Sequence, residues 1–271
     1  MIWLILSIAF ITGASCLQLF IPKSRTVIQF SSYTTGIGLI LTLISSTLIY
    51  LRGGSSTLII TLSGFLGKIV FVQTPLSYFF ILFVATLSLI SLLFSSLYLK
   101  PYANLKRVKY HLFVLQGLTV CMLLLPLTGS VLLFLMVWEG MSMTAFFLLY
   151  FNFESVTVQV GGKIYFIFMH IGFFILVVAF SLLTFWCGSS DFSSYLGFFL
   201  HATLFQSSLL FLLFLLGFGT KAGIFPLYVW LPKAHVVAPG NASPIMSGIM
   251  IKMGIYGIVM FLLMIPTFSL T

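Results

Sequence analysis

Uncharged apolar runs of about twenty residues recur along this chain, and they constrain its fold more than any other feature. A helix of about 20 residues spans the ~30 Å hydrocarbon layer of a membrane, because each residue adds 1.5 Å. A β-barrel would instead show short segments of alternating polarity. The chain is 61% hydrophobic and 6% charged, whereas ordinary soluble domains carry about 25% charged residues. The sequence therefore predicts an all-α polytopic membrane protein.

Proline and glycine divide these runs into eight expected spanning helices. Between residues 55 and 74, β-branched residues, two glycines and a lysine favour an interfacial hairpin over a further span. Because the N-terminus has no basic segment, we expect a first spanning helix there rather than a cleaved signal peptide. The expected spans are 2–21, 27–51, 75–99, 110–125, 130–151, 163–186, about 202–231 and 243–265, with Pro266 after the last.

The net charge of +9 indicates membrane orientation rather than nucleic-acid binding, because the basic residues are scattered among loops and helices. Most lie in the first, third, fifth and seventh loops, which share one side of the membrane. The positive-inside rule then predicts that the N-terminus and the C-terminus lie outside. The basic residues on this shared side are Lys23, Arg25, Lys100, Lys106, Arg107, Lys109, Lys163 and Lys233.

Three charged residues lie deep within apolar runs: Glu139, Lys221 and Lys252. By helical rise, Glu139 is about 14 Å into the fifth span and Lys252 about 12 Å into the eighth. Charges at such depth are expensive to bury, and they usually face a bundle interior and mark an ion pathway. The alternatives are that the lysines reach an interface or form a structural ion pair. We favour the functional interpretation for all three residues.

The seventh span is expected to be broken. As one straight helix, residues 202–231 would be about 45 Å long, which exceeds the hydrocarbon layer. Three glycines and Pro226 between positions 217 and 226 provide a place to break, and Lys221 lies there. Broken helices carrying ionisable groups form ion sites in transporters. If Glu139 approaches and leaves Lys221, the lysine alternately holds and releases a proton.

Other polar residues extend this predicted proton path. Lys252 would be the station after Lys221, joined to it through water and side chains such as Ser247 and His235. His235 lines the route or caps a helix, and we favour the route. For His170, inside the sixth span, a relay role and a satisfied core histidine are equally open. His111 and His201 are expected near the interface without a role, and Trp138 is expected to pack.

Three motifs contain Glu139, Lys221 and Lys252: W-E-G-M-S-M at 138–143, G-F-G-T-K-A-G-I-F-P-L-Y-V-W-L-P-K-A-H at 217–235 and A-P-G-N-A-S-P-I-M-S-G-I-M-I-K-M-G-I-Y-G at 238–257. They resemble the antiporter-like proton-translocating subunits. That family includes large membrane-arm subunits of respiratory complex I, Mrp sodium/proton antiporters and membrane subunits of formate-hydrogenlyase-type hydrogenases. The segment 246–257 is most similar to the hydrogenase branch, and L-P-K-A-H-V-x-A-P to the subunit-4 branch of complex I.

The resemblance implies roles for matched positions. Glu139 matches the glutamate of the fifth helix, Lys221 the lysine of the broken seventh helix, and Lys252 the lysine of the eighth. His235 matches the histidine after the W-L-P turn. This chain departs from the family pattern at two positions. Tyr228 stands where the family often has a histidine, so one possible relay residue is a tyrosine here. Thr74 stands where an aspartate commonly precedes the third helix.

The resemblance also implies an organisation. Residues 1–109 would hold three N-terminal helices with the hairpin, and 110–271 the first of two inverted repeats. The expected function is proton translocation in an NADH-quinone oxidoreductase or hydrogenase complex, with redox chemistry in partner subunits. A Mrp-type cation/proton antiporter component, and a truncated or split-gene half-subunit with a structural role, remain alternatives.

Partners and location follow from the same resemblance. We expect other membrane subunits, a chain supplying the second half, protons or Na⁺, and the lipid bilayer as partners, but no nucleic acid. No redox cofactor or metal site is expected, because the three cysteines lie apart and no axial histidine pair occurs. An energy-coupling membrane is expected, with the bacterial cell membrane favoured over the mitochondrial inner membrane.

Overall fold

A computed structural model of the 271-residue chain describes residues 1–61, 68–102 and 104–265. Within these residues, eight helical segments are long and apolar enough to cross a membrane. The predicted all-α polytopic fold is therefore confirmed. The elements are α1 (Ile2–Leu17), η1 (Gln18–Phe20), α2 (Ser24–Leu51), β1 (Ser56–Thr61), β2 (Lys68–Gln73), α3 (Pro75–Tyr98), α4 (Leu105–Leu124), η2 (Leu125–Leu127), α5 (Val131–Leu149), η3 (Tyr150–Asn152), α6 (Val156–Cys187), η4 (Phe192–Ser194), α7 (Tyr195–His201), α8 (Leu204–Ala222), η5 (Leu227–Val229), α9 (Trp230–Val237), α10 (Ser243–Ile245), the π-helical turn η6 (Met246–Met250) and α11 (Ile251–Met264).

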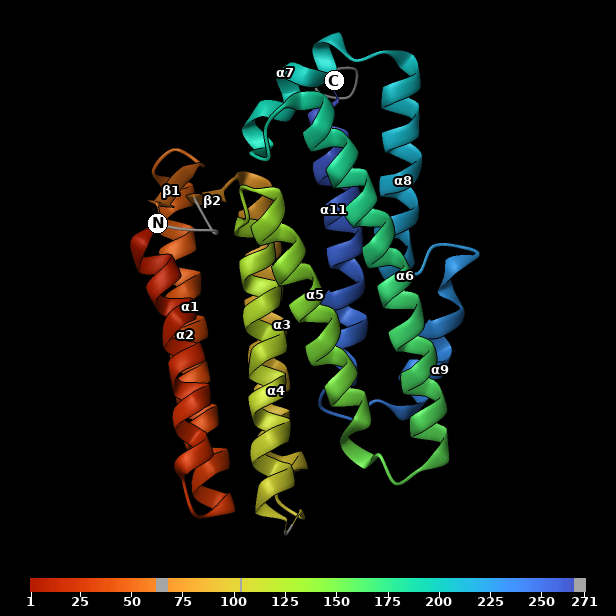
Figure 1. The fold of residues 1–271 in the computed structure, drawn as a ribbon. Helices are drawn as coiled ribbons and strands as arrows, with labels where there is room; N and C mark the ends of the chain where they lie inside the picture. Colours follow the sequence, from red (N-terminus) through yellow and green to blue (C-terminus); the bar gives the residue numbers. More distant parts are fainter. Residues whose placement is uncertain (62–67, 103, 266–271) are drawn as a thin grey trace.

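The helices form one bundle (Figure 1). The α1–α2 pair lies at one edge, α3 and α4 lie in the middle, and α5, α6, α8 and α11 lie on the other side. The turns that join α1 to α2 and α5 to α6 lie at the end opposite the β-hairpin. An ion pair between Arg107 in the first turn of α4 and Glu154 before α6 joins the segments after the third and fifth spans at this end. The basic first and third loops therefore share one end of the bundle.

The predicted hairpin is confirmed as two antiparallel strands, with Ser56 opposite Gln73 and Thr61 opposite Lys68. Its turn, residues 62–67, lies outside the described residues, as does Pro266. The Gly129 amide donates a hydrogen bond of 2.8 Å to the Val70 carbonyl of β2. Lys68 forms an ion pair of 3.3 Å with Asp191. These contacts fasten the hairpin to the loops at the same end as the start of α5.

Three helices begin earlier than predicted: α2 by three residues, and α4 and α6 by at least five. Helix α4 starts at Leu105 rather than 110, because Asn104 caps it by accepting a hydrogen bond from the Arg107 amide at 3.2 Å. The first turn of α4 is charged and does not continue the apolar run, so we predicted a loop there. Helix α6 starts at Val156 rather than 163, so Lys163 is a helical residue. The short helix α7 was not predicted.

The predicted break in the seventh span is confirmed. Helix α8 ends at Ala222, and Gly223 follows in the left-handed conformation with φ +68°. Glycine adopts this conformation without the strain that a side chain introduces. The chain then makes the short turn η5 before it resumes as α9. Lys221 is thus the second-last residue of the first half of the broken helix.

Glycines let three helices approach closely around the break. A Cβ on Gly172 of α6 would lie 3.1 Å from the carbonyl oxygen of Gly217 in α8. A Cβ on Gly254 of α11 would lie 2.5 Å from the backbone nitrogen of Ala222. A Cβ on Gly172 would force its neighbour to shift by a few tenths of an ångström, and a Cβ on Gly254 would clash outright, so backbone packs on backbone at both places. The end of α8 is therefore fixed between α6 and α11.

Candidate functional site

Lys221 is buried, with 2% of its surface exposed, and its ammonium group faces α5. Its Nζ donates a hydrogen bond of 2.6 Å to the Ser142 hydroxyl and lies 3.5 Å from the Trp138 carbonyl oxygen. The same Nζ lies 4.5 Å from the centre of the Trp138 ring, within the range of a cation–π contact. A hydroxyl, a carbonyl and an indole thus surround the ammonium group, and all three are neutral.

Helix α5 presents these three groups together because of its periodicity. Trp138 and Ser142 are four residues apart, so their side chains lie on the same face of the helix. The Ser142 hydroxyl donates its proton to the Trp138 carbonyl at 3.1 Å and keeps its lone pairs for Lys221. The hydroxyl is thereby oriented as an acceptor toward the lysine.

Glu139 lies on the same helix, about 12 Å from its first residue by helical rise, and it contacts His170 of α6. Its Oε1 is 3.0 Å from His170 Nε2, and about a fifth of each side chain is exposed. His170 Nδ1 lies 2.8 Å from the Phe166 carbonyl oxygen, which can only accept, so Nδ1 carries a proton. A proton between Glu139 Oε1 and His170 Nε2 would complete this contact, and either side chain could hold it.

The expected contact of Glu139 with Lys221 is not made directly. Among the residues that the structure describes, no ion pair joins the two. The second carboxyl oxygen of Glu139, Oε2, is buried and has no hydrogen-bond partner among these residues. Glu139 and Ser142 are three residues apart on α5, so the glutamate and the group that holds Lys221 occupy neighbouring positions on one helix.

The third charge belongs to a row of polar groups at the start of the eighth span. His235 Nδ1 lies 3.5 Å from the Ser243 hydroxyl. The Ser247 hydroxyl donates to the Ser243 carbonyl at 2.9 Å, and Lys252 Nζ donates to the Ser247 carbonyl at 3.1 Å. The π-helical turn η6 contains Ser247, and such turns occur often at functional sites. The structure therefore places His235, Ser247 and Lys252 in one row with Ser243.

The surroundings of Lys252 differ from those expected. It lies at the depth that its sequence position indicates, but its side chain is exposed on the surface of the described chain. The buried face of α11 carries Met253, Gly254, Tyr256 and Gly257 instead. Tyr228 is also apart from the buried charges: it lies in η5, is 44% exposed and stacks on Phe225.

Sequence reasoning missed two residues of this site. Ser142 holds Lys221, and Trp138, expected only to pack, contributes both its ring and its carbonyl oxygen. The signal was present in W-E-G-M-S-M, where the serine follows the tryptophan by one helical turn. His111 was also misplaced: it is buried and lies 3.1 Å from the side-chain oxygen of Asn241, rather than facing the interface.

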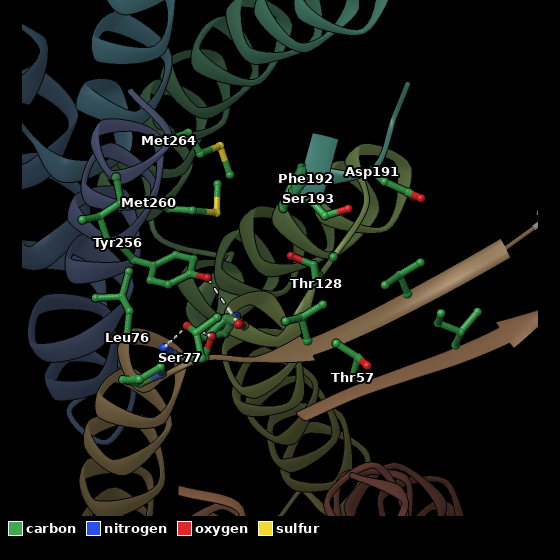
Figure 2. A pocket seen from close by; sticks show the side chains of 18 of the residues that line it. Thr57, Leu76, Ser77, Thr128, Asp191, Phe192, Ser193, Tyr256, Met260 and Met264 are labelled. Atoms are coloured by element: carbon green, nitrogen blue, oxygen red, sulfur yellow. Dashed lines mark hydrogen bonds between the residues drawn. The ribbon is translucent and has the colours of Figure 1, made fainter. Parts of the chain in front are cut away.

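A cavity of about 650 Å³ lies elsewhere, between the hairpin, the start of α3 and the end of α11. Figure 2 shows Tyr256 and Met260 on one side of it and Thr57 and Asp191 on the other. Its lining is largely apolar and includes none of Glu139, Lys221 and Lys252. The cavity is therefore separate from the buried charges.

The chain is 35% identical to "Hydrogenase-4 component B" of Escherichia coli (strain K12) over 183 residues, which are 68% of this chain and 27% of the relative. It thus spans about a quarter of that relative's length. Its fold is similar to a chain of the membrane-bound sulfane sulfur reductase, an archaeal respiratory membrane complex. The TM-score is 0.81 at 22% identity, covering 95% of this chain and 40% of the other.

A second similar fold is found in the Mrp complex from Dietzia sp. DQ12-45-1b. The TM-score is 0.83 at 20% identity, over 98% of this chain and 29% of the other. The family model for "NADH:quinone oxidoreductase/Mrp antiporter, TM" matches residues 128–271, which is more than half of the chain and includes all three motifs. This chain therefore belongs to the NADH:quinone oxidoreductase/Mrp antiporter membrane family.

Proposed function

We propose that this chain is a proton-translocating subunit in which Glu139, Lys221 and Lys252 form a proton relay. One observation carries the proposal: Lys221 is buried among neutral groups. A buried lysine in a structural ion pair would need a carboxylate partner, since an unpaired charge is costly to bury. Neutral hydrogen-bond acceptors stabilise the ammonium form less, so the amine can release its proton when its surroundings change.

The pair formed by Glu139 and His170 supplies protons to this lysine. Glu139 Oε1 and His170 Nε2 are 3.0 Å apart, so the two side chains can share a proton and either residue can hold it. Movement of the proton from Glu139 to His170 would leave a carboxylate on α5, near the group that holds Lys221. This carboxylate favours the ammonium form of the lysine, and its neutralisation favours release. His170 is thereby a member of the relay.

Beyond Lys221, the relay continues to the row that contains Lys252, Ser247, Ser243 and His235. The row combines two titratable side chains with two hydroxyl groups, which can both donate and accept. Exposed Lys252 would be covered by another part of the assembly, such as a second repeat on this or another polypeptide. Tyr228, on the outer surface of η5, would serve the relay only through such a partner.

The same proposal includes the organisation of the complex. Residues 1–109 form an N-terminal unit and 110–271 the first antiporter-like repeat. Redox chemistry would occur in partner subunits of the NADH-quinone oxidoreductase or hydrogenase type. The concentration of basic residues in the first and third loops supports a cytoplasmic position for that end, with the N-terminus outside, in a bacterial cell membrane. A Mrp-type exchange of Na⁺ for protons is the alternative function.

Proton flux tests the proposal. The assembled complex that contains this chain is reconstituted in proteoliposomes, and internal pH is followed after its electron donor is added. We expect Lys221→Ala and Glu139→Gln each to lower the flux by about 100-fold or more, the usual effect of losing a proton-transfer group. Lys163→Ala and Glu154→Gln are matched controls, because both residues are exposed. Normal flux in Lys221→Ala would refute the relay.

Ion identity is tested in the same vesicles. If the flux starts only when a Na⁺ gradient replaces the electron donor, the chain is an antiporter component. If electron donor alone drives flux without Na⁺, the redox-coupled function is supported. If the complex assembles but Glu139→Gln and Lys221→Ala have normal flux under both conditions, the chain has a structural role.

A further inference from the structure

Tyr165 of α6 lies between the two lysine sites, and sequence reasoning gave it no role. Its side chain is fully buried. Its hydroxyl lies 3.3 Å from the Ser142 carbonyl oxygen on α5 and 3.6 Å from the Met250 sulfur. Its ring packs edge-on against Trp230 of α9, with centroids 5.4 Å apart. One side chain thus contacts α5, α9 and the π-helical turn.

Each hydroxyl contact leads to one of the lysines. Ser142, whose carbonyl accepts from Tyr165, is the residue whose hydroxyl holds Lys221 at 2.6 Å. Met250 is the last residue of the π-helical turn η6. The same turn contains Ser247, whose carbonyl accepts from Lys252 at 3.1 Å. Tyr165 therefore joins the segment that holds Lys221 to the segment that holds Lys252.

The chemistry of the hydroxyl makes this link exclusive. A tyrosine hydroxyl carries one proton, whereas the Ser142 carbonyl and the Met250 thioether both only accept. At any moment the proton can form a strong, near-linear hydrogen bond to one of them and not to the other. A bond to Ser142 fixes the backbone beside Lys221, and a bond to Met250 fixes the turn beside Lys252. The thioether is the weaker acceptor, so the bond to Ser142 is the ground state.

We propose that Tyr165 is a positioning residue that couples the Lys221 site to the Lys252 site by switching its single hydroxyl proton between α5 and the π-helical turn. This inference rests on the proposed relay and adds a residue to it. The buried ring remains on Trp230 in both states, so the switch needs only rotation of the hydroxyl proton and small shifts of the two backbones. No proton leaves the tyrosine.

Tyr165→Phe removes the hydroxyl and keeps the ring. Tyr256→Phe is the matched control. Tyr256 is also a buried tyrosine that donates to a backbone carbonyl, that of Pro126 at 3.2 Å, but it borders the separate cavity (Figure 2). In the reconstituted complex, we expect Tyr165→Phe to lower proton flux about fivefold to tenfold, the effect of one hydrogen bond on a rate. Tyr256→Phe should stay within about twofold of the unmodified complex.

A pH profile separates positioning from mere packing. If Tyr165 adjusts the lysine sites, Tyr165→Phe shifts the pH of half-maximal flux by about half a unit or more, which corresponds to one hydrogen bond. A packing defect would lower flux by the same factor at every pH, and that result would overturn the proposal. Met250→Leu keeps the side-chain volume but removes the second acceptor, so its profile should shift as well even if Tyr165→Phe assembles poorly.

Lys221→Ala is measured in parallel to tell two failures apart. If Lys221→Ala lacks flux while Tyr165→Phe and Met250→Leu match the unmodified complex, the coupling role is wrong and the relay stands. If Lys221→Ala has normal flux, the relay fails and the role of Tyr165 fails with it.

Discussion

Replacement of Ser142 by alanine tests the site at its closest contact. The variant removes the hydroxyl that accepts a 2.6 Å hydrogen bond from the Lys221 ammonium group. What remains is the Trp138 carbonyl at 3.5 Å, beyond the usual range of a good N–H···O bond, and the Trp138 ring at 4.5 Å. We expect a less stable protein, because the buried ammonium group loses its best partner.

The magnitude follows from the geometry. A hydrogen bond to a charged group contributes about 1.5–3 kcal/mol to stability. The ring contact offsets none of this loss, because it is present before and after the change. We therefore expect Ser142→Ala to lower the free energy of unfolding by about 2 kcal/mol. In a Lys221→Met background the same change should cost about 1 kcal/mol or less, since only the neutral bond to the Trp138 carbonyl is then lost.

The assay is a double-mutant cycle on unfolding in mixed detergent micelles, with SDS as the denaturant. The coupling between Ser142 and Lys221 should reach about 1–2 kcal/mol, above the ~0.5 kcal/mol scatter of independent sites. Thr144→Val is the control: its hydroxyl donates to the Gly140 carbonyl on the same helix and does not contact Lys221. Coupling of Ser142 to Lys221 no larger than that of Thr144 would refute the assignment of Ser142 as the lysine's partner.

Two further predictions concern packing and the shared proton. Gly254→Ala should lower the unfolding temperature, because its Cβ would lie 2.5 Å from the backbone nitrogen of Ala222, whereas Gly13→Ala has nothing within 4 Å and should be neutral. Equal midpoints for the two variants in thermal unfolding would contradict this packing. His170→Ala should destabilise the chain by about 1–3 kcal/mol by leaving Glu139 without its partner. Adding Glu139→Gln should recover part of the loss in SDS unfolding, and a double variant no more stable than His170→Ala would exclude a shared proton.

Several features of the fold were predictable from local signals. The eight spans follow from apolar runs, which need only length and composition to be recognised. The hairpin follows from the β-branched residues flanking positions 62–67, and the break after Ala222 from Gly223 and Pro226. The start of α4 was misjudged, because Asn104 caps a turn whose charges resemble those of a loop.

The charged residues of the candidate site were predictable from the sequence, but their contacts, including those of Lys221 with Ser142 and Trp138, were not. The cost of burying charge singles out Glu139 and Lys221 whatever their partners are. Which neighbour each one meets depends on how α5, α6 and α8 are rotated about their axes. For α6 and α8, that rotation is fixed where the Gly172 and Gly217 backbones meet, a contact between residues far apart in the sequence.

Length, composition and spacing along the chain are enough to predict a helical membrane protein, the place where its seventh span breaks, and the charged residues within its apolar runs. Those properties depend on runs and spacings within single segments. Only the packed structure reveals that Glu139 contacts His170, that Lys221 contacts Ser142 and Trp138, and that the Lys252 side chain is exposed. The contacts join residues of separate helices, and the exposure of Lys252 depends on which helices surround it. Both are set by the packing of the bundle.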